Sequence, residues 1–299
     1  MSQTTTPTAG LDIGKLTLDL ALTGQTEVTR LGLEATGGYE AEVYQALTKA
    51  GLEVVRFQPA QVRFYAKSRL RRAKTDRLDA HLIAACTAAY DGPVRPARDQ
   101  RLTALAEPMR LFEQITADIA CVRTRCESYR DEAILAQLKA QIKQLVAWRR
   151  RVLTQIVTVL RAEADLKQRL DLLLSIPGLG ERTAVQLLIT MPELGRITRE
   201  EAASLAGLAP FDRSSGQSEG QRHIAGGRAG IRTALYAACL PASYRWNPAL
   251  VAMRERLSAA GKPFKLVMVA CARKLLIFAN TVLQRGTAWT AEPPKARAA

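Results

Sequence analysis

The sequence has few of the residues that stabilise disulfide-rich or zinc-bound proteins. Its 299 residues include five cysteines and two histidines, and no two cysteines form a Cys-x-x-Cys pair. A zinc ribbon or a disulfide framework is therefore not expected, and a reducing intracellular compartment fits. No apolar run reaches eighteen residues, and Ser2–Gly10 lacks an apolar signal core. These absences predict a cytoplasmic protein without a membrane span.

Acidic residues are scarce relative to basic ones. Lys and Arg number 43 against 28 Asp and Glu, which gives a net charge of +15 and a pI near 10.0. Such a balance indicates a polyanionic partner, of which nucleic acid is the commonest. A membrane surface is the alternative, but no basic amphipathic anchor stands out. The length and the hydrophobic fraction of 47% predict a globular protein, with two domains favoured over one.

Strand and helix patterns alternate in the first part of the chain. Strands are predicted over 10–22 (one strand or a short hairpin), 28–34 and 52–57, and helices over 40–50 and, as one long helix, 61–90. This alternation is typical of an α/β domain, which we place at residues 8–95.

The remainder of the chain has a helical pattern. Over residues 96–174, apolar residues recur every three or four positions, which predicts two long antiparallel helices forming a coiled coil, with a break near Arg130. Such a stripe serves either packing or dimerisation. The stripe consists of Ile134, Leu138, Ile142, Leu145, Trp148, Val152, Ile156 and Val159. Residues 175–286 predict an all-helical domain, and 287–299 a disordered tail.

Four acidic residues occur in positions that suit a metal centre. Asp12 lies in the first predicted strand and Glu34 ends the next, while Asp76 and Asp79 are three apart on a predicted helix and face one side. Mg²⁺ prefers oxygen ligands and can bind substrate phosphate, so the set predicts a nuclease or strand-transfer centre. Each part also has a plainer explanation. A strand Asp followed by Gly opens the phosphate loop of actin-like ATPases, and Asp-x-x-Asp among arginines is usually a salt-bridged helix face.

A basic segment precedes the helical acids. It carries seven Lys or Arg within fifteen residues, with Phe64 and Tyr65 among them, and no acid before Asp76. Phosphate contact with aromatic stacking is the functional interpretation, and a solvated helix face is the alternative. The cations predicted to contact nucleic acid are Arg69, Arg71, Arg72 and Lys74.

A polar, glycine-rich loop around Ser215 offers a nucleophile. Flanking arginines, Arg222 and Arg228 among them, could neutralise a scissile phosphate while a serine forms a phosphoserine, with His223 as a nearby base. A flexible polar loop without chemistry is the alternative. The residues alone do not separate Ser215 from Ser214 or Ser218.

Two further segments predict contacts with a nucleic-acid backbone. The turn containing Gly178 and Gly180 resembles that of a helix-hairpin-helix, in which glycine amides meet a phosphate; an ordinary helix turn is the alternative. Lys262 starts a basic helix near the C-terminus.

Four motifs in order carry a family resemblance: Asp12, Glu34-Ala-Thr-Gly, Lys74-Thr-Asp-x-x-Asp-Ala and a distant Ser215-Gly216. They resemble the transposases of the insertion-sequence-110 family, also called DEDD transposases and bridge-RNA-guided recombinases. The resemblance implies an RNase H-like (RuvC-like) domain, a coiled-coil dimerisation segment and a helical domain with a catalytic serine. It further implies that Asp12, Glu34, Asp76 and Asp79 hold Mg²⁺ and that Ser215 attacks DNA. A guide RNA, and a homodimer that assembles into a tetramer with composite sites, are the implied partners.

One departure from that family concerns the spacing of the first two acids. Only 21 residues separate Asp12 from Glu34, about half what the family fold places there, so its third strand and first helix would be missing. In that fold the glutamate-bearing strand runs parallel to the first strand, away from the second, which normally needs a crossover of about a dozen residues. The tight connection Thr23–Glu27 favours pairing beside the second strand instead. We therefore predict a rewired sheet or an internal deletion.

Two other functions are compatible with the same residues. A junction-resolving nuclease would use water as nucleophile and would not need Ser215. An inactive nucleic-acid-binding remnant would keep the basic surface without cleavage.

Overall fold

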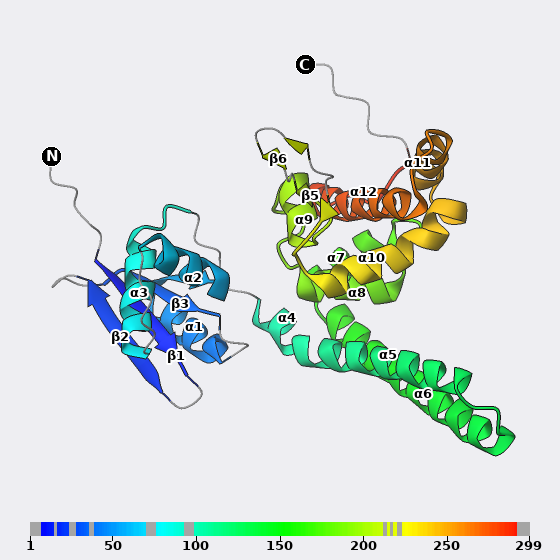
Figure 1. Cartoon of the computed structure of the whole chain (residues 1–299), viewed down its shortest axis with the longest axis horizontal. Helices are drawn as coiled ribbons and strands as arrows, with labels where there is room; N and C mark the ends of the chain where they lie inside the picture. Colours follow the sequence, from blue (N-terminus) through cyan, green and yellow to red (C-terminus); the bar gives the residue numbers. More distant parts are fainter. Residues whose placement is uncertain are drawn as a thin grey trace. The chain divides into compact units, whose positions relative to one another are not determined.

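The computed structural model describes residues 7–14, 17–23, 28–35, 39–69, 76–92, 99–211, 214–215, 218–219 and 223–291; within these ranges it leaves out the side chains of residues 23, 76–78, 211, 214–215 and 218–219. The chain divides into two compact units, residues 1–97 and 98–299. The first unit is α/β and the second is mainly helical (Figure 1).

A four-stranded sheet organises the first unit. Its strands are β1 (Thr8–Ile13), β2 (Leu18–Thr23), β3 (Arg30–Glu34) and β4 (Glu53–Phe57). Their order is β2-β1-β3-β4, with β2 antiparallel to β1 and with β1, β3 and β4 parallel. The predicted hairpin and both further strands are thus confirmed.

The predicted pairing of the glutamate-bearing strand is wrong. β3 pairs with β1, with Leu11 opposite Leu33, on the side away from β2. The crossover rule does not apply because β2 itself carries the chain back, so that Thr23 at its end pairs with Thr8 at the start of β1. The six residues before Arg30 then span only two strand spacings, about 10 Å, which a chain of that length reaches easily.

Helices pack on both faces of this sheet. α1 (Glu40–Lys49) covers the face of Leu11 and Leu33, whereas α2 (Pro59–Ser68) and α3 (Asp76–Ala88) pack on the other. The apolar face of edge strand β2 stays open. Its side chains Leu18, Leu20 and Leu22 are 59%, 59% and 54% exposed.

The predicted single helix over 61–90 is also wrong, because α2 ends at Ser68 and α3 begins at Asp76. A continuous helix would bring Arg69 beside Arg72 and Arg71 beside Lys74, and like charges three residues apart repel. An aspartate in the first turn of α3 is favourable, because a helix N-terminus carries partial positive charge.

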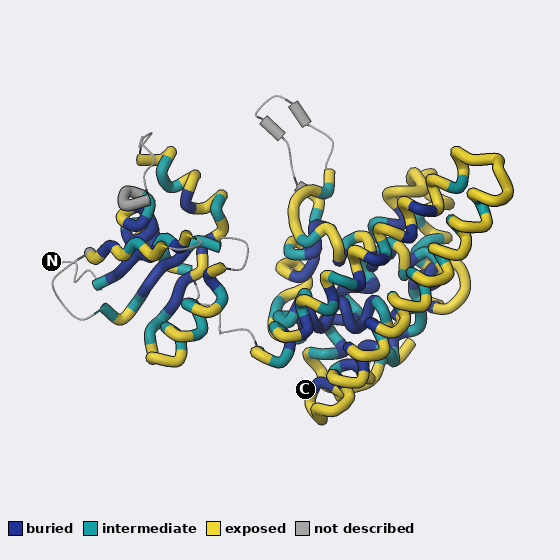
Figure 2. Tube along the Cα trace, turned by 90° about the horizontal axis from the view of Figure 1, so that it is seen from below, coloured by how far each residue is buried: buried dark blue, intermediate teal, exposed yellow. Residues whose placement is uncertain are grey.

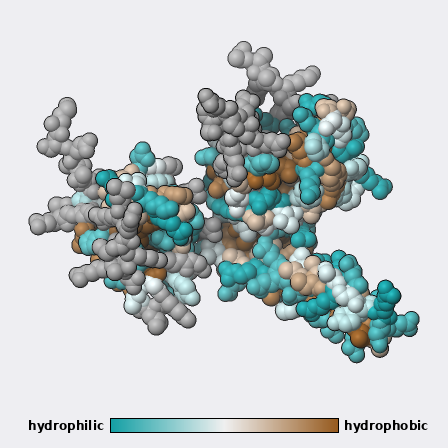
Figure 3. Space-filling model, viewed as in Figure 1, coloured by the Kyte–Doolittle hydropathy of each residue, from teal (hydrophilic) through white to brown (hydrophobic). Residues whose placement is uncertain are grey.

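Two long helices form a hairpin in the second unit. Its first four helices are α4 (Gln100–Ala104), α5 (Ala106–Glu127), α6 (Glu132–Ala162) and α7 (Ala164–Leu174). The helix pair and its break are confirmed, and Asp131 caps α6 by accepting hydrogen bonds from the backbone amides of Ala133 (2.8 Å) and Ile134 (3.1 Å). The predicted stripe holds only in part: Val152 and Ile156 are buried, whereas others face solvent. The exposed members are Ile134, Trp148 and Val159 at 38%, 42% and 49%. Figure 3 shows a mostly hydrophilic hairpin surface with a few apolar residues near its tip.

The remaining helices complete one apolar core with α4–α7. They are α8 (Glu181–Thr190), α9 (Arg199–Leu205), α10 (Ala229–Pro241), the short π-helix η1 (Ala242–Trp246), α11 (Pro248–Ala259) and α12 (Phe264–Arg285). Leu160 of α6, Leu187 of α8 and Leu275 of α12 are fully buried in this core (Figure 2). By length and hydropathy α12 could cross a membrane, but its buried residues make it a central helix of the core.

Candidate functional site

Three carboxylate residues lie side by side across three neighbouring strands of the sheet. Asp12 of β1 is the Cα partner of Asp19 in β2. Leu11 pairs with Leu33 across β1 and β3, so Asp12 and Glu34 occupy the next level on that side. Side chains at one level of a sheet point to the same face. The register therefore brings Asp19, Asp12 and Glu34, each half-buried, into one row.

α3 lies directly against the face that carries this row. A Cβ atom added to Gly10 would be 2.2 Å from Ala80 O and Ala84 N, so the backbones of strand and helix touch. The Thr8 hydroxyl donates a 3.4 Å hydrogen bond to Ala84 O. Thr8 thus meets α3 at Ala84, and Gly10 meets it between Ala80 and Ala84, nearer the start of the helix.

The next residue of β1 on that face is Asp12, and the next turn of α3 towards its N-terminus begins at Asp76. Four residues of a helix advance about 6 Å and two residues of a strand about 6.6 Å. Each turn of α3 therefore lies beside the next residue of β1 that faces it. The first turn of α3, which contains Asp76 and Asp79, therefore lies at the Asp12 end of the sheet. The Asp76 side chain is outside the described residues, and Asp79 is half-buried.

These donors suit Mg²⁺ in kind, because all are carboxylate oxygens. Among the described side chains, however, no group of three or more His, Cys, Asp or Glu is placed to hold a metal ion. The role of Asp12, Glu34, Asp76 and Asp79 as metal ligands stays a prediction. The sequence did not identify Asp19 as part of the site. A hairpin predicted with its turn at residues 14–17 would have paired Ile13 with Leu18 and therefore Asp12 with Asp19.

The basic segment is described only in part. Arg69 lies at the C-terminus of α2, with its guanidinium 5.6 Å from the ring centre of Tyr65. Phe64 is 67% exposed, which leaves its ring available for stacking. Three of the predicted contacts, Arg71, Arg72 and Lys74, lie outside the described residues.

Short paired strands carry the candidate serines, so the predicted all-helical domain is wrong at this point. They are β5 (Pro210–Phe211), β6 (Ser214–Ser215), β7 (Ser218–Glu219) and β8 (His223–Ile224). β5 pairs with β8 and β6 with β7, both antiparallel. Ser215 is opposite Ser218 in the pair β6–β7, whereas His223 is opposite Phe211 in the separate pair β5–β8. The pairing therefore does not favour His223 as a base for Ser215 of the same chain.

The glycine turn before α8 has one packed and one open position. Gly178 has φ +94°, and an added Cβ would overlap the Cβ of Ala242 at 2.2 Å. Asn247 Nδ2 donates a 3.1 Å hydrogen bond to Pro177 O. Gly180, the N-cap of α8, is exposed and has nothing within 4 Å of an added Cβ.

The remaining predicted contacts differ in how far their side chains are engaged. Arg228 donates to Glu193 (2.6 and 3.0 Å) and to Thr190 O (2.7 Å), which ties the start of α10 to the end of α8. Lys262 is exposed between α11 and α12. Arg222 lies outside the described residues.

Comparisons with known proteins cover both units. A transposase model of the DEDD type from the IS110 group matches residues 12–133, and the model "Transposase IS116/IS110/IS902 family" matches residues 170–255. Two relatives named "Pilin gene-inverting protein", from Moraxella lacunata and Moraxella bovis, are 30% identical over 87% of this chain and 81% of theirs. An "Insertion element IS110 uncharacterized 43.6 kDa protein" from Streptomyces coelicolor is 27% identical over 75% of this chain and 57% of its own length. The chain therefore belongs to the IS110 family of transposases, enzymes of DNA recombination.

Proposed function

We propose that this transposase excises and inserts a mobile element in the cytoplasm, using a serine nucleophile and Mg²⁺-binding carboxylates, and that RNA guides it to DNA. The observation that carries the proposal is the register of β1 and β3. It sets Asp12 level with Glu34, at the end of the sheet where α3 begins, despite the short spacing between the two acids.

Asp12, Glu34, Asp76 and Asp79 would hold Mg²⁺, with Asp19 as an additional neighbour. Bound there, Mg²⁺ would neutralise charge on a scissile phosphate and polarise its bond to the leaving oxygen.

Ser215 would supply the attacking oxygen. Its Oγ forms a bond to phosphorus while the bond from phosphorus to a deoxyribose oxygen breaks. The hydroxyl proton passes to that departing oxygen, so a phosphoserine and a free DNA hydroxyl result. Attack by the hydroxyl of another DNA end then reverses the step and releases serine. Arg222 would neutralise charge on the phosphate.

The acids and the serine belong to different units of the chain. We infer that a homodimer assembles into a tetramer on donor and target DNA, so that the acids of one subunit act with the serine of another. A guide RNA from the same element would then specify the DNA, because the basic surface of the protein reads charge and not sequence.

The test is a covalent-adduct assay with the full chain, Mg²⁺, DNA carrying the element ends and RNA transcribed from the element. Wild type should give a protein–DNA adduct that Ser215→Ala abolishes and that the matched variants Ser214→Ala and Ser218→Ala retain. Omitting the RNA should also abolish the adduct. An undiminished adduct from Ser215→Ala would reject Ser215 as the nucleophile.

The second candidate is a nuclease that uses water. The acid row favours it, since all its members lie in the first unit. Under this alternative Ser215→Ala cuts DNA as well as wild type does, whereas Asp12→Asn does not. If neither variant differs from an inactive wild type, the chain is a binding remnant.

A further inference from the structure

Arg182 is a half-buried cation whose side chain makes no hydrogen bond or ion pair with any residue that the structure describes. It lies in the first turn of α8, and its Nε atom is buried without a partner. Its guanidinium carbon lies 5.5 Å from the centre of the Phe112 ring. A guanidinium carries five N–H donors, so a site without an acceptor favours an incoming anion.

A second arginine, Arg149 of α6, is close enough for its charge to act on Arg182. Burial and then the charge of Arg149 lower the pKa of Arg182, and the nearby carboxylate of Glu113 opposes this only in part. Glu113 is itself engaged, accepting a 2.6 Å hydrogen bond from Gln186 Nε2. Two like charges held together in this way repel, and a bound anion would relieve the repulsion.

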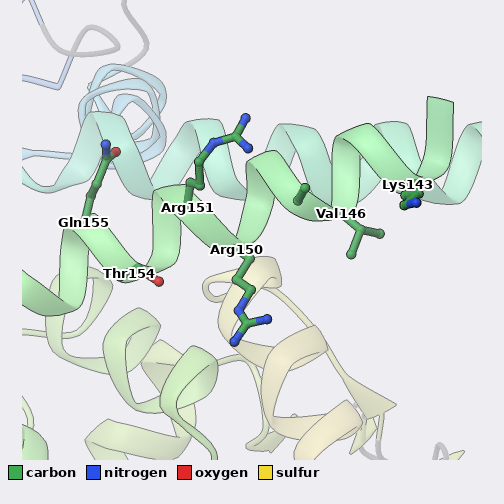
Figure 4. Close-up of a pocket in the computed structure, with 7 residues that line it drawn as sticks. Lys143, Val146, Arg150, Arg151, Thr154 and Gln155 are labelled. Carbon is green, nitrogen blue, oxygen red and sulfur yellow. The ribbon is translucent and has the colours of Figure 1, made fainter. Parts of the chain in front are cut away.

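The surroundings on α6 are strongly basic. After Glu132 this helix contains no Asp or Glu, and its cations are Lys139, Lys143, Arg149, Arg150, Arg151 and Arg161. An open hollow of about 620 Å³ runs along α6 and is lined by Lys143, Arg150 and Arg151 together with small or uncharged residues. Figure 4 shows Arg150 and Arg151 leaving α6 on opposite sides, with Arg150 pointing towards the neighbouring helices. Neither makes an ion pair with a residue in the described part of the chain.

We propose that Arg149 of α6 and Arg182 of α8 bind the phosphodiester backbone of duplex DNA, with Lys143 and Arg150 of the hollow on α6 as additional phosphate contacts. Gly180, the exposed N-cap of α8, lies two residues before Arg182. No aromatic side chain lines the hollow on α6, so the surface holds phosphates without stacking on bases and without reading sequence. The proposal rests on the proposed function only in taking DNA as the partner.

A purely structural role is the competing explanation. Gln186 is 3% exposed, and its Oε1 is also buried without a partner, one turn from Arg182. A buried water could join Arg182 Nε to this oxygen. Such a water would satisfy one donor and leave the charges of Arg149 and Arg182 unbalanced.

The test measures binding of the full chain to a short DNA duplex of arbitrary sequence over a salt series. Each phosphate contact contributes about 0.9 to the salt slope and about eightfold to affinity near 0.1 M salt. Arg149→Ala with Arg182→Met should therefore reduce the slope by about 1.8 and weaken binding about 60-fold. Arg182→Met keeps the side-chain volume. The matched control removes Arg123 and Arg125 of α5, which are exposed and make no ion pair with described residues, and should change the slope far less.

Each outcome separates the possibilities. Wild-type binding with an unchanged slope in the double variant rejects the inference and leaves the proposed function standing. The same titration is made with RNA. If the double variant loses affinity for RNA but not for the DNA duplex, RNA is the partner and the choice of DNA is wrong. If wild type binds no duplex at low salt, both proposals fail. If Arg182→Met does not fold, the single variant Arg149→Ala must still lower the slope by about 0.9, or the inference is wrong.

Discussion

Replacing Gly10 with alanine separates the position of α3 from the chemistry of the carboxylates. The added Cβ would lie 2.2 Å from backbone atoms of Ala80 and Ala84, whereas ordinary contact begins at 3.4 Å, so α3 must retreat by about 1.2 Å. Overpacking of this kind lowers the free energy of unfolding by about 1–3 kcal/mol. α3 also carries Asp76 and Asp79, and a displacement of about 1 Å at a reacting centre can lower the rate about 10²-fold. We therefore expect Gly10→Ala to fold with reduced stability and to lose most adduct formation with every carboxylate intact.

Urea denaturation and the adduct assay measure the two effects, and Gly32 supplies a matched control. An alanine there would meet Thr87 Oγ1 at 1.8 Å, which is a side-chain atom. Thr87→Ala removes that atom, so the double variant Gly32→Ala, Thr87→Ala should recover part of the lost stability. No side-chain truncation can rescue Gly10→Ala, because its obstacle is the helix backbone. A Gly10→Ala protein with wild-type stability and activity would refute the packing of α3 on β1.

Three further variants test other contacts. Arg228→Ala should lower the free energy of unfolding by about 2 kcal/mol, because it removes charged hydrogen bonds to Glu193 and Thr190; a lower salt slope of DNA binding at unchanged stability would contradict this. Arg101→Ala should lower the melting temperature at neutral pH, and this difference from wild type should shrink progressively as the pH falls below about 4. The reason is that hydrogen bonds from Arg101 hold the pKa of Asp99 and Asp165 below their ordinary values, so the stabilisation is present above those ordinary values and is lost as pH falls through the lowered ones. Leu20→Ser should change the stability of the monomer by less than about 0.5 kcal/mol, since the side chain is 59% exposed, but should reduce self-association in light scattering; a clear drop in melting temperature would mean that the leucine is covered.

Local patterns in the sequence predicted the elements better than their pairing. Alternation of apolar and polar residues over 10–22 predicted one strand or a short hairpin, and β1 and β2 are the hairpin. The pairing of β3 depends on the end of the sheet at which β2 ends, because β3 begins at that same end. Alternation of apolar and polar residues does not encode this. Apolar periodicity does not reveal the break between α2 and α3. The break coincides with the basic segment, in which like charges on one helix face would repel. These charges belong to Arg69, Arg71, Arg72 and Lys74.

For the candidate site, too, the sequence predicted individual residues better than their neighbours in space. Residue type and position in a strand pointed to Asp12 and Glu34, but only the register reveals Asp19 as their neighbour. Clustered positive charge did not distinguish Arg228, which is engaged with Glu193, from Arg182, whose guanidinium has no partner among the described residues. That distinction depends on tertiary packing, so no pattern along the chain contains it.

The return of the chain along β2 makes the junction at residues 23–30 a point where the fold tolerates change in length. Both flanking strands end there on the same side of the sheet, so a whole strand and helix can be gained or lost without shifting either strand by one residue. Trimming at this junction alters the flank of the sheet and spares the alignment of its acids.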